Sequence, residues 1–269
     1  MQSADTVFTG SIPALYDQYL GPALFEPYAV DLAGRLRGLA AGTLLEIAAG
    51  TGRVTRALAR TLPPAVAITA SDLNQAMVDF AASQPIARPV AWRQADALAL
   101  PFFDDSFDVV VCQFGVMFFP DKMAGYREAR RVLKPGGRFL FSVWGPIEAN
   151  EFGRVTTEAL VALFPDDPPL FLARTPHGYH DPGAIATQLD GAGFTSVAID
   201  TVTLTSELPS ADHLAMGFCQ GSPLRSEIEA RRPGGLAAVT DAVAALIAAR
   251  LGPGPIAGGM QAHIVTAAR

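Results

Sequence analysis

Three acidic residues, each close to the end of a short apolar run, could together bind a polar ligand. Glu46 lies in such a run and is followed by the glycine turn Ala48–Gly52, while Asp72 and Asp96 follow two later runs. A carboxylate has two acceptor oxygens and can bind a hydroxyl, an amine or a cation. Glycine permits backbone conformations closed to other residues and lets a ligand lie against the peptide plane. A strand, a glycine turn and a helix in this order predict a ligand site at the carboxyl end of a sheet strand.

Two better-known glycine motifs do not fit this turn. The chain has no G-x-x-x-x-G-K-[ST] run, which a phosphate-binding P-loop requires. A dinucleotide fingerprint counted from Gly50 needs a third glycine where Thr55 stands, and counted from Ala48 it ends on Arg53. An acid 20 positions after Gly52, namely Asp72, can accept from both hydroxyls of a ribose, but dinucleotide enzymes place an acid similarly. Asp72 also suits the start of a helix, which is the structural alternative for it.

Several segments resemble class I S-adenosylmethionine-dependent methyltransferases. Glu46–Gly52 is similar to their E/D-x-G-x-G-x-G motif, with Ala48 in the first glycine position as in the ubiquinone/menaquinone-biosynthesis (UbiE-like) type. Asp72–Met77 resembles their D-L-S-x-x-M segment. The stretch 100–110, LPFFDDSFDVV, followed by 131–139, RVLKPGGRF, is typical of the family in that order. The resemblance covers roughly residues 40–144 closely and the flanks loosely.

The resemblance implies S-adenosylmethionine as the cofactor and S-adenosylhomocysteine as its product. It implies that Asp72 binds the ribose hydroxyls and that Asp96 accepts a hydrogen bond from the adenine amine. Met77 would pack its thioether against adenine, and an N-terminal tyrosine, Tyr16 or Tyr19, would cover the methionine end. The full set of cofactor-binding residues that we expect is Tyr19, Glu46, Ala48, Gly50, Gly52, Asp72, Leu73, Met77, Asp96, Ala97, Leu98, Gln113 and Phe114.

The methyl acceptor has a much weaker signature. Phe118 could line an acceptor pocket or belong to the core. A general base is needed only for an acceptor that keeps its proton near neutral pH. His177 and His180 are the candidates, ahead of Tyr179 and His213. We expect no metal, because no further Cys or His pair completes the spacing of His177 and His180 and Gly178 disrupts helical alignment between them.

Composition narrows the class of partner. Half of the 269 residues are hydrophobic, 17% are charged, and the net charge is −6. A nucleic acid or an anionic membrane would favour a basic face, so we expect neither as a partner. Cys112 and Cys219 form no disulfide framework or metal spacing. Without a signal-peptide pattern or a long apolar span, the sequence predicts a cytoplasmic protein that acts on a small molecule.

The elements that must position these residues alternate between strand and helix. This order predicts an α/β, doubly wound, Rossmann-like and mostly parallel seven-stranded sheet, with helices on both faces and an antiparallel last strand. We expect an N-terminal helical lid (1–40), a cofactor-binding core (41–145) and a remainder (146–269) with helical acceptor-site cover at about 146–180 and 209–251. Within these, Gly21-Pro22 should separate two helices, the fifth strand should begin at Arg138, and a bulge should lie near Asp200-Thr201.

Our first functional hypothesis is methyl transfer from S-adenosylmethionine to a small, partly apolar metabolite by in-line displacement. An NAD(P)-dependent oxidoreductase is the alternative from another enzyme class. A non-catalytic nucleoside-binding protein on the same fold is the third.

Overall fold

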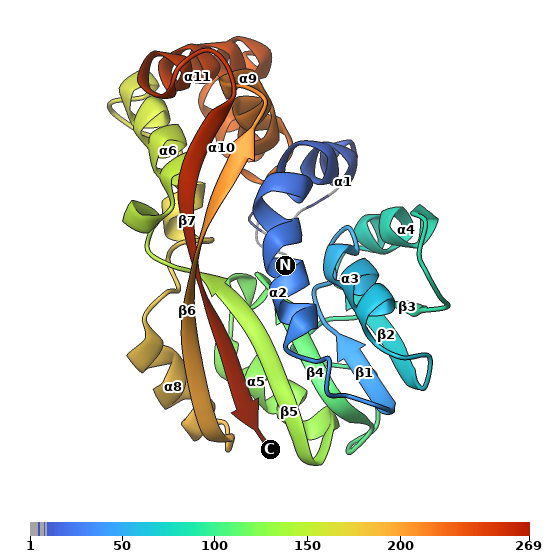
Figure 1. Ribbon diagram of the computed structural model, residues 1–269. Coiled ribbons are helices and arrows are strands. Elements are labelled where there is room, and N and C mark those ends of the chain that lie inside the picture. The colour runs from blue at the N-terminus through green and yellow to red at the C-terminus, as the bar shows by residue number, and fades with distance from the viewer. Residues whose placement is uncertain (1–4, 6–7, 9) are drawn as a thin grey trace. The chain divides into compact units, whose positions relative to one another are not determined.

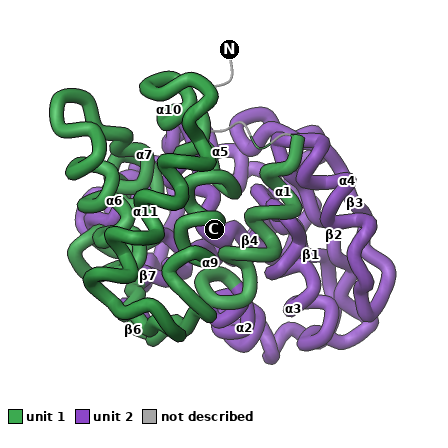
Figure 2. The backbone as a smooth tube through the Cα atoms, turned by 90° about the horizontal axis from the view of Figure 1, so that it is seen from above, with its two compact units in different colours: residues 1–25, 144–179, 203–261 green, residues 26–143, 180–202, 262–269 purple. Residues whose placement is uncertain are grey.

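The computed structural model of the chain describes residues 5, 8 and 10–269 (Figure 1). The predicted N-terminal lid, 1–40, therefore includes residues 1–4, 6–7 and 9, which lie outside the described residues. The chain forms two compact units, which Figure 2 shows in green and purple. Unit 1 comprises Met1–Phe25, Trp144–Tyr179 and Thr203–Gln261, and unit 2 comprises Glu26–Val143, His180–Val202 and Ala262–Arg269.

The described strands form one seven-stranded sheet in the order β3-β2-β1-β4-β5-β7-β6. Neighbours among β1 to β5 pair in parallel. This confirms the predicted Rossmann-like, mostly parallel sheet. The strands are β1 (Gly42–Glu46), β2 (Val66–Asp72), β3 (Ala91–Gln94), β4 (Phe107–Gln113), β5 (Leu133–Trp144), β6 (Thr195–Leu208) and β7 (Ile256–Ala268).

Apolar runs in the central strands account for their burial. In β4, Val109 to Cys112 are all buried, and the last three residues of β1 are buried as well. A strand whose successive side chains are all buried is covered on both faces, as in a parallel sheet between two helical layers. The residues at the carboxyl ends of these strands are therefore attached to the buried core of unit 2.

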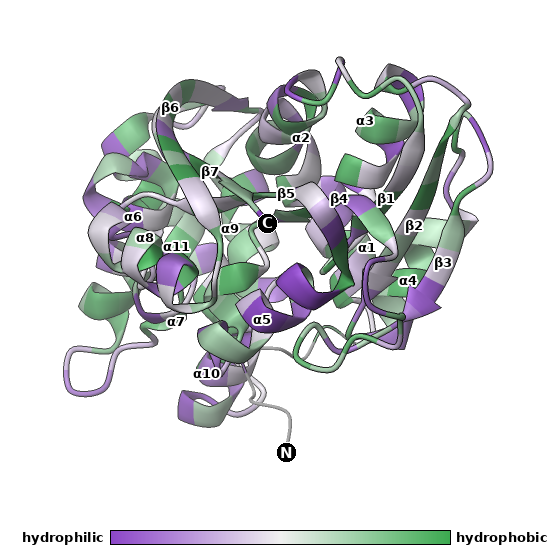
Figure 3. Cartoon of the chain, turned by 90° about the horizontal axis from the view of Figure 1, so that it is seen from below, coloured by the Kyte–Doolittle hydropathy of each residue, from purple (hydrophilic) through white to green (hydrophobic). Residues whose placement is uncertain are grey.

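The helices of unit 2 follow the strands in alternation. Helix α5 is largely hydrophilic in sequence and in Figure 3, and it buries a stripe that includes Tyr126 and Ala129. Asp121 begins α5 by accepting a hydrogen bond from the Ala124 N–H at 2.9 Å. The helices of this unit are α2 (Glu26–Gly34), α3 (Arg53–Thr61), α4 (Gln75–Ser83), η3 (Val116–Phe118), α5 (Lys122–Val132) and α8 (Pro182–Gly191).

Unit 1 is mainly helical. The apolar stripe of α11 buries Val239, Val243 and Ile247, as its 3.6-residue periodicity predicts. The helices of this unit are α1 (Ile12–Leu15), η2 (Tyr16–Phe25), η4 (Ile147–Ala149), α6 (Glu151–Leu163), α7 (Phe171–Arg174), α9 (Ala211–Ala215), η5 (Met216–Gln220), α10 (Leu224–Arg231) and α11 (Leu236–Leu251).

Two predicted boundaries are wrong. Gly21-Pro22 does not separate two helices, because Tyr16–Phe25 is a π-helix that contains Pro22 and continues into α2. Its wider turn accommodates a proline ring that would clash in an ordinary helix interior. Strand β5 begins at Leu133 rather than Arg138: Leu133 pairs with Phe107, and the register then shifts before Arg138 pairs with Val109.

In strand β6 the alternation of burial changes phase near Asp200-Thr201, where we predicted a bulge. Its less exposed residues fall on odd positions up to Ile199 and on even positions from Val202.

Among the described residues no single helix could span a membrane; α10 and α11 meet the length and composition criteria only as a pair, with a bend of 111° between them.

Candidate functional site

Polar residues converge at the carboxyl ends of four adjacent parallel strands in unit 2. Glu46 is the last residue of β1, Asp72 of β2 and Gln113 of β4, and Asp96 lies two residues beyond the end of β3. Backbone hydrogen bonds connect the segments after these strands. The Ala49 N–H donates to the Ser71 carbonyl, and the Ala95 N–H donates to the Asp72 carbonyl, both at 2.9 Å. The sheet therefore places these side chains along one edge, where α/β proteins bind ligands.

Glu46 is almost fully buried, with 1% of its surface exposed. The Thr55 hydroxyl, on the first turns of α3, donates to Glu46 Oε2 at 2.6 Å. Burial raises the pKa of Glu46 to about 8; the Thr55 hydrogen bond opposes the rise, the nearby Asp72 adds to it and Arg56 opposes it. A carboxyl with this pKa is mostly protonated at neutral pH. A cation that approaches it favours the ionised form and lowers its pKa.

Asp72 is 7% exposed and uses both oxygens to hold the surrounding backbone. The Gly50 N–H donates to Oδ2 and the Asn74 N–H to Oδ1, each at 2.8 Å. Burial raises the pKa of Asp72, and these two hydrogen bonds oppose the rise. Helix α4 begins at Gln75 with Asn74 rather than Asp72 as its N-cap residue, so the helix-start alternative for Asp72 is wrong. The Asn74 side chain also hydrogen-bonds to Asp72, which leaves the carboxylate capacity for one further donor.

The turn after β1 uses left-handed backbone at three positions. Ala48, Gly50 and Gly52 have φ angles of 54°, 55° and 80°. A Cβ added at Gly50 meets no atom within 4 Å, whereas one added at Gly52 would lie 3.0 Å from Ala81 and from Trp92. Only Gly50 therefore faces open space in which a ligand could lie against the backbone. Gly52 is required by packing of α3 on its neighbours.

Asp96 is exposed and closes a tight turn. Its Oδ1 accepts from the Leu98 N–H at 2.9 Å, and its carbonyl accepts from the Ala99 N–H at 3.0 Å. Ala97 and Leu98, at the apex, are half-buried. We call residues 95–98 the base loop, because the resemblance assigns adenine to them.

The remaining cofactor candidates of unit 2 differ in exposure. Met77 is buried on the first turn of α4, and Leu73 and Gln113 are half-buried. Phe114 has a φ of 52° and is buried, with its ring edge-on to Tyr28 at 5.4 Å. The Phe114 ring thus packs in the core of unit 2. Phe118, proposed for an acceptor pocket, is half-buried in η3.

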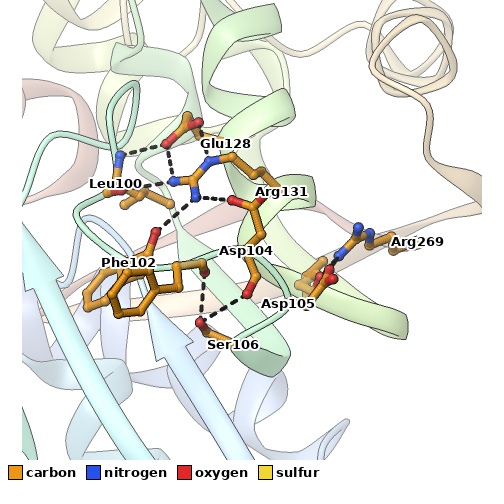
Figure 4. A network of polar contacts seen from close by, with 10 residues as sticks. Leu100, Phe102, Asp104, Asp105, Ser106, Glu128, Arg131 and Arg269 are labelled. Atoms are coloured by element: carbon orange, nitrogen blue, oxygen red, sulfur yellow. Dashed lines mark hydrogen bonds and ion pairs between the residues drawn. The ribbon is translucent and has the colours of Figure 1, made fainter.

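An ion pair on α5 holds the segment that follows the base loop. Arg131 Nε donates to Glu128 Oε1 and Nη2 donates to Glu128 Oε2, both at 2.7 Å (Figure 4). The same guanidinium donates to the carbonyls of Leu100 and Phe102 at 2.9 Å and to Asp104 Oδ1 at 2.7 Å. Glu128 Oε2 accepts from the Leu100 N–H at 2.7 Å. The contacts of Arg131 thus join the stretch 100–110 to the stretch 131–139, the two segments whose sequence is most typical of the family.

Predicted residues outside this group lie in both units. In unit 1, Tyr16 stacks on Phe25 at 4.7 Å and Tyr19 packs on His213 at the same distance between ring centroids. His177, also in unit 1, is 7% exposed and its Nδ1 lies 2.9 Å from the Gly145 carbonyl oxygen. His180 belongs to unit 2, where its backbone forms a hydrogen bond with His263. The two histidine candidates therefore belong to different units.

Sequence reasoning missed Thr55 as a partner of Glu46. The signal was a polar residue on the buried face of a helix, nine residues after the acid. The sequence did indicate that Cys112 and Cys219 form no disulfide, and both are free and buried. In the described part of the chain no cluster of three or more His, Cys, Asp or Glu suits a metal ion.

The sheet and the acids at its carboxyl edge define the class. A Rossmann-like sheet of this order, with a glycine turn after β1 and acids at the ends of β1 and β2 and just beyond β3, is typical of α/β enzymes that bind a nucleoside-containing cofactor.

Comparison with known proteins identifies the family to which this chain belongs. A family model described as a methyltransferase domain matches residues 45–141. The ubiquinone/menaquinone biosynthesis C-methyltransferase UbiE of Idiomarina loihiensis is 30% identical over 193 residues, which cover 67% of this chain and 76% of that protein. UbiE of Geobacter sulfurreducens is 36% identical over 128 residues, which cover 46% of this chain and 50% of that protein. The chain therefore belongs to the UbiE-type family of S-adenosylmethionine-dependent methyltransferases.

A solved structure shares the fold. Phosphoethanolamine N-methyltransferase 2 of Haemonchus contortus, in complex with phosphomonomethylethanolamine and S-adenosylhomocysteine, aligns with a TM-score of 0.58. The alignment covers 96% of this chain and 56% of that chain at 15% identity, a likeness of fold alone. Family membership disfavours the oxidoreductase alternative, as does Thr55, whose side chain binds Glu46 where the dinucleotide fingerprint requires glycine.

Proposed function

We propose that this protein methylates a small, partly apolar molecule and binds S-adenosylmethionine at the carboxyl edge of β1 to β4. The observation that carries the proposal is the placement of Glu46, Asp72 and Asp96 after three adjacent parallel strands. A nucleoside linked to an amino acid has a base, a ribose and a charged end, and three acceptors in a row suit these three parts.

Each acid takes the part of the cofactor that suits its surroundings. Asp72 would accept from the ribose hydroxyls beside the hydrogen bonds that it accepts from Gly50 and Asn74. Asp96 accepts from the adenine amine while Ala97 and Leu98 frame the ring. Glu46 would bind the cationic end, and Gly50 leaves space for the ligand beside the turn. Tyr19, Leu73, Met77, Gln113 and Phe114 complete the proposed set.

The reaction requires mainly that the protein position the acceptor atom and the methyl group. When bound, S-adenosylmethionine supplies a methyl group on a positively charged sulfur, already activated for displacement. The chain must hold the acceptor atom about 3 Å from the methyl carbon, in line with the bond that breaks, and exclude water. An acceptor that ionises on its own needs no base, whereas a phenol or an alcohol does.

We propose His177 as the base for acceptors that keep their proton. With the Gly145 carbonyl 2.9 Å from Nδ1, the proton of a neutral ring belongs on Nδ1, and Nε2 is then the basic nitrogen of the ring.

Two measurements test the proposed function. Thermal unfolding with S-adenosylhomocysteine, NADH and ATP should show stabilisation by the first alone, because a ligand that binds only the folded state raises its stability. Product formation from S-adenosylmethionine should then be measured with carboxylic acids, phenols, thiols, amines and activated aromatic carbon acids. The last class is included because the UbiE relatives are named C-methyltransferases.

The outcomes separate the hypotheses. Stabilisation by NADH instead would favour the oxidoreductase. Binding of S-adenosylhomocysteine with no product from any acceptor class would favour the non-catalytic nucleoside-binding protein. The cytoplasmic location and the absence of nucleic-acid and membrane partners stay predictions of the sequence.

A further inference from the structure

We propose that the Glu128–Arg131 ion pair on α5 positions the base loop, so that Asp96 selects adenine over bases that lack its amine. This inference rests on the proposed function, which assigns adenine to residues 95–98. Arg131 and Glu128 are positioning residues in it, since neither belongs to the proposed cofactor contacts.

The base loop is held at both ends by different parts of unit 2. Upstream, the Ala95 N–H donates to the Asp72 carbonyl at 2.9 Å, which ties the loop to the end of β2. Downstream, both backbone polar groups of Leu100 form hydrogen bonds: its N–H donates to Glu128 and its carbonyl accepts from Arg131. Between these anchors only Asp96 to Ala99 remain, folded into a single turn.

Every N–H group of the Arg131 guanidinium has a hydrogen-bond acceptor. Its five N–H groups are matched by five acceptor contacts, to Glu128 twice, to the carbonyls of Leu100 and Phe102, and to Asp104 (Figure 4). A planar fork that binds several acceptors at once fixes direction as well as distance. Hydrogen bonds to Glu128 and Asp104 hold the pKa of Arg131 above its usual range, so the charge persists at every working pH.

Loss of the downstream anchor should change what Asp96 can discriminate. Asp96 is exposed, and the bonds that shape its turn all lie within residues 96–99. Without the hydrogen bonds to Leu100, this turn loses its downstream polar anchor and its carboxylate loses a fixed direction. A hydrogen bond depends steeply on angle, so selectivity for the amine declines before the fold does.

A second ion pair on the same part of the chain provides a matched control. Lys134 Nζ lies 2.8 Å from Asp108 Oδ2, and that oxygen also accepts from the Thr43 N–H at 2.7 Å. Thr43 is near the start of β1, at the amino end of the strands. Removing Lys134 thus removes a somewhat more exposed ion pair without touching the base loop.

The experiment compares binding of S-adenosylhomocysteine with S-inosylhomocysteine, in which a carbonyl oxygen replaces the adenine amine. In the wild-type protein we expect a preference of about 10- to 100-fold for adenine, the value of a hydrogen bond to a charged group. Arg131→Gln should reduce this ratio to below about 5-fold, and Lys134→Gln should leave it unchanged. Calorimetric titration gives both dissociation constants for each protein.

The ratio separates positioning from a merely structural role, because loss of folded protein lowers both affinities equally. If Arg131→Gln does not fold, Arg131→Lys and Glu128→Gln test the same anchor more gently. A wild-type ratio retained in the folded variants would overturn the proposal. Equal binding of both ligands by the wild type would overturn it together with the Asp96 assignment, and binding of neither would instead overturn the proposed function on which it rests.

Discussion

Gly115 packs directly on Ala48. A Cβ added at Gly115 would lie 2.5 Å from the Ala48 methyl carbon and 2.7 Å from Cys112 Sγ. Gly115 follows β4 and Ala48 follows β1, so this contact joins the turns at the carboxyl ends of two adjacent strands. Ala48 also has a left-handed backbone, which glycine adopts more readily. The small size of both residues is therefore a condition for the geometry of the glycine turn.

A double-mutant cycle should show this coupling. Gly115→Ala should destabilise the protein by about 1–3 kcal/mol through overpacking. Ala48→Gly relieves a left-handed strain of about 1–2 kcal/mol, offset by about 0.5–1 kcal/mol of chain entropy. Because the second change also removes the methyl that clashes, Gly115→Ala should cost less in the Ala48→Gly background. Urea unfolding of the four proteins measures it, and additive effects would show that the two residues do not press on each other.

Glu46 should make stability fall as pH rises. Its folded pKa is raised to about 8 from 4.5, so between these values the folded state binds a proton that the unfolded state has lost. The contribution of the protonated carboxyl is complete below pH 4.5 and is lost as pH rises through 8. Glu46→Gln, which is neutral and keeps an acceptor for Thr55, should show a flatter decline from pH 5 to 8.5. Denaturant unfolding across this range decides it; parallel curves for the two proteins would contradict the burial argument.

The same residue should couple cofactor binding to proton release. A cation near Glu46 favours the ionised carboxyl, so affinity for S-adenosylmethionine should rise with pH up to about 8. The difference between wild type and Glu46→Gln removes any titration of the ligand itself. Titration calorimetry in two buffers of different ionisation heat should find more protons released by the wild type at pH 7. Equal release by both proteins would place the cationic end of the cofactor away from Glu46.

Asp72→Asn should abolish most of the stabilisation by S-adenosylhomocysteine. Two hydrogen bonds from ribose to a carboxylate correspond to a loss of at least about 100-fold in affinity. The amide keeps the shape and one acceptor for the Gly50 or Asn74 N–H. Asp79→Asn, on the exposed side of α4, is the control and should bind normally. A thermal shift that survives in Asp72→Asn would show that the ribose lies elsewhere.

His177→Asn tests the proposed base. The asparagine amide can replace the Nδ1 bond to the Gly145 carbonyl but offers no basic nitrogen at the Nε2 position. With phenol or alcohol acceptors, kcat should fall by about 10²- to 10⁴-fold. Affinity for S-adenosylhomocysteine and turnover of carboxylate acceptors should not change. His180→Asn is the matched control, and a larger loss in that variant would transfer the role to His180.

The sequence alone predicted the fold class, the cofactor and the order of the acids along the chain. It could do so because these properties depend on local patterns. Apolar runs alternate with helical periodicity, a glycine turn follows the first strand, and the stretches 100–110 and 131–139 have a composition typical of one family. The phase change in β6 was equally local.

Contacts between distant residues could be read only from the tertiary structure. The Thr55 hydroxyl reaches Glu46 because α3 packs back on β1, and burial of that pair sets the pKa of the acid. Packing also decided that Gly52 faces Trp92 while Gly50 faces open space. The π-helix through Pro22 and the early start of β5 at Leu133 depend on neighbouring segments that no local pattern specifies. Burial and hydrogen-bond direction arise from the packed chain as a whole, and so only the folded protein defines them.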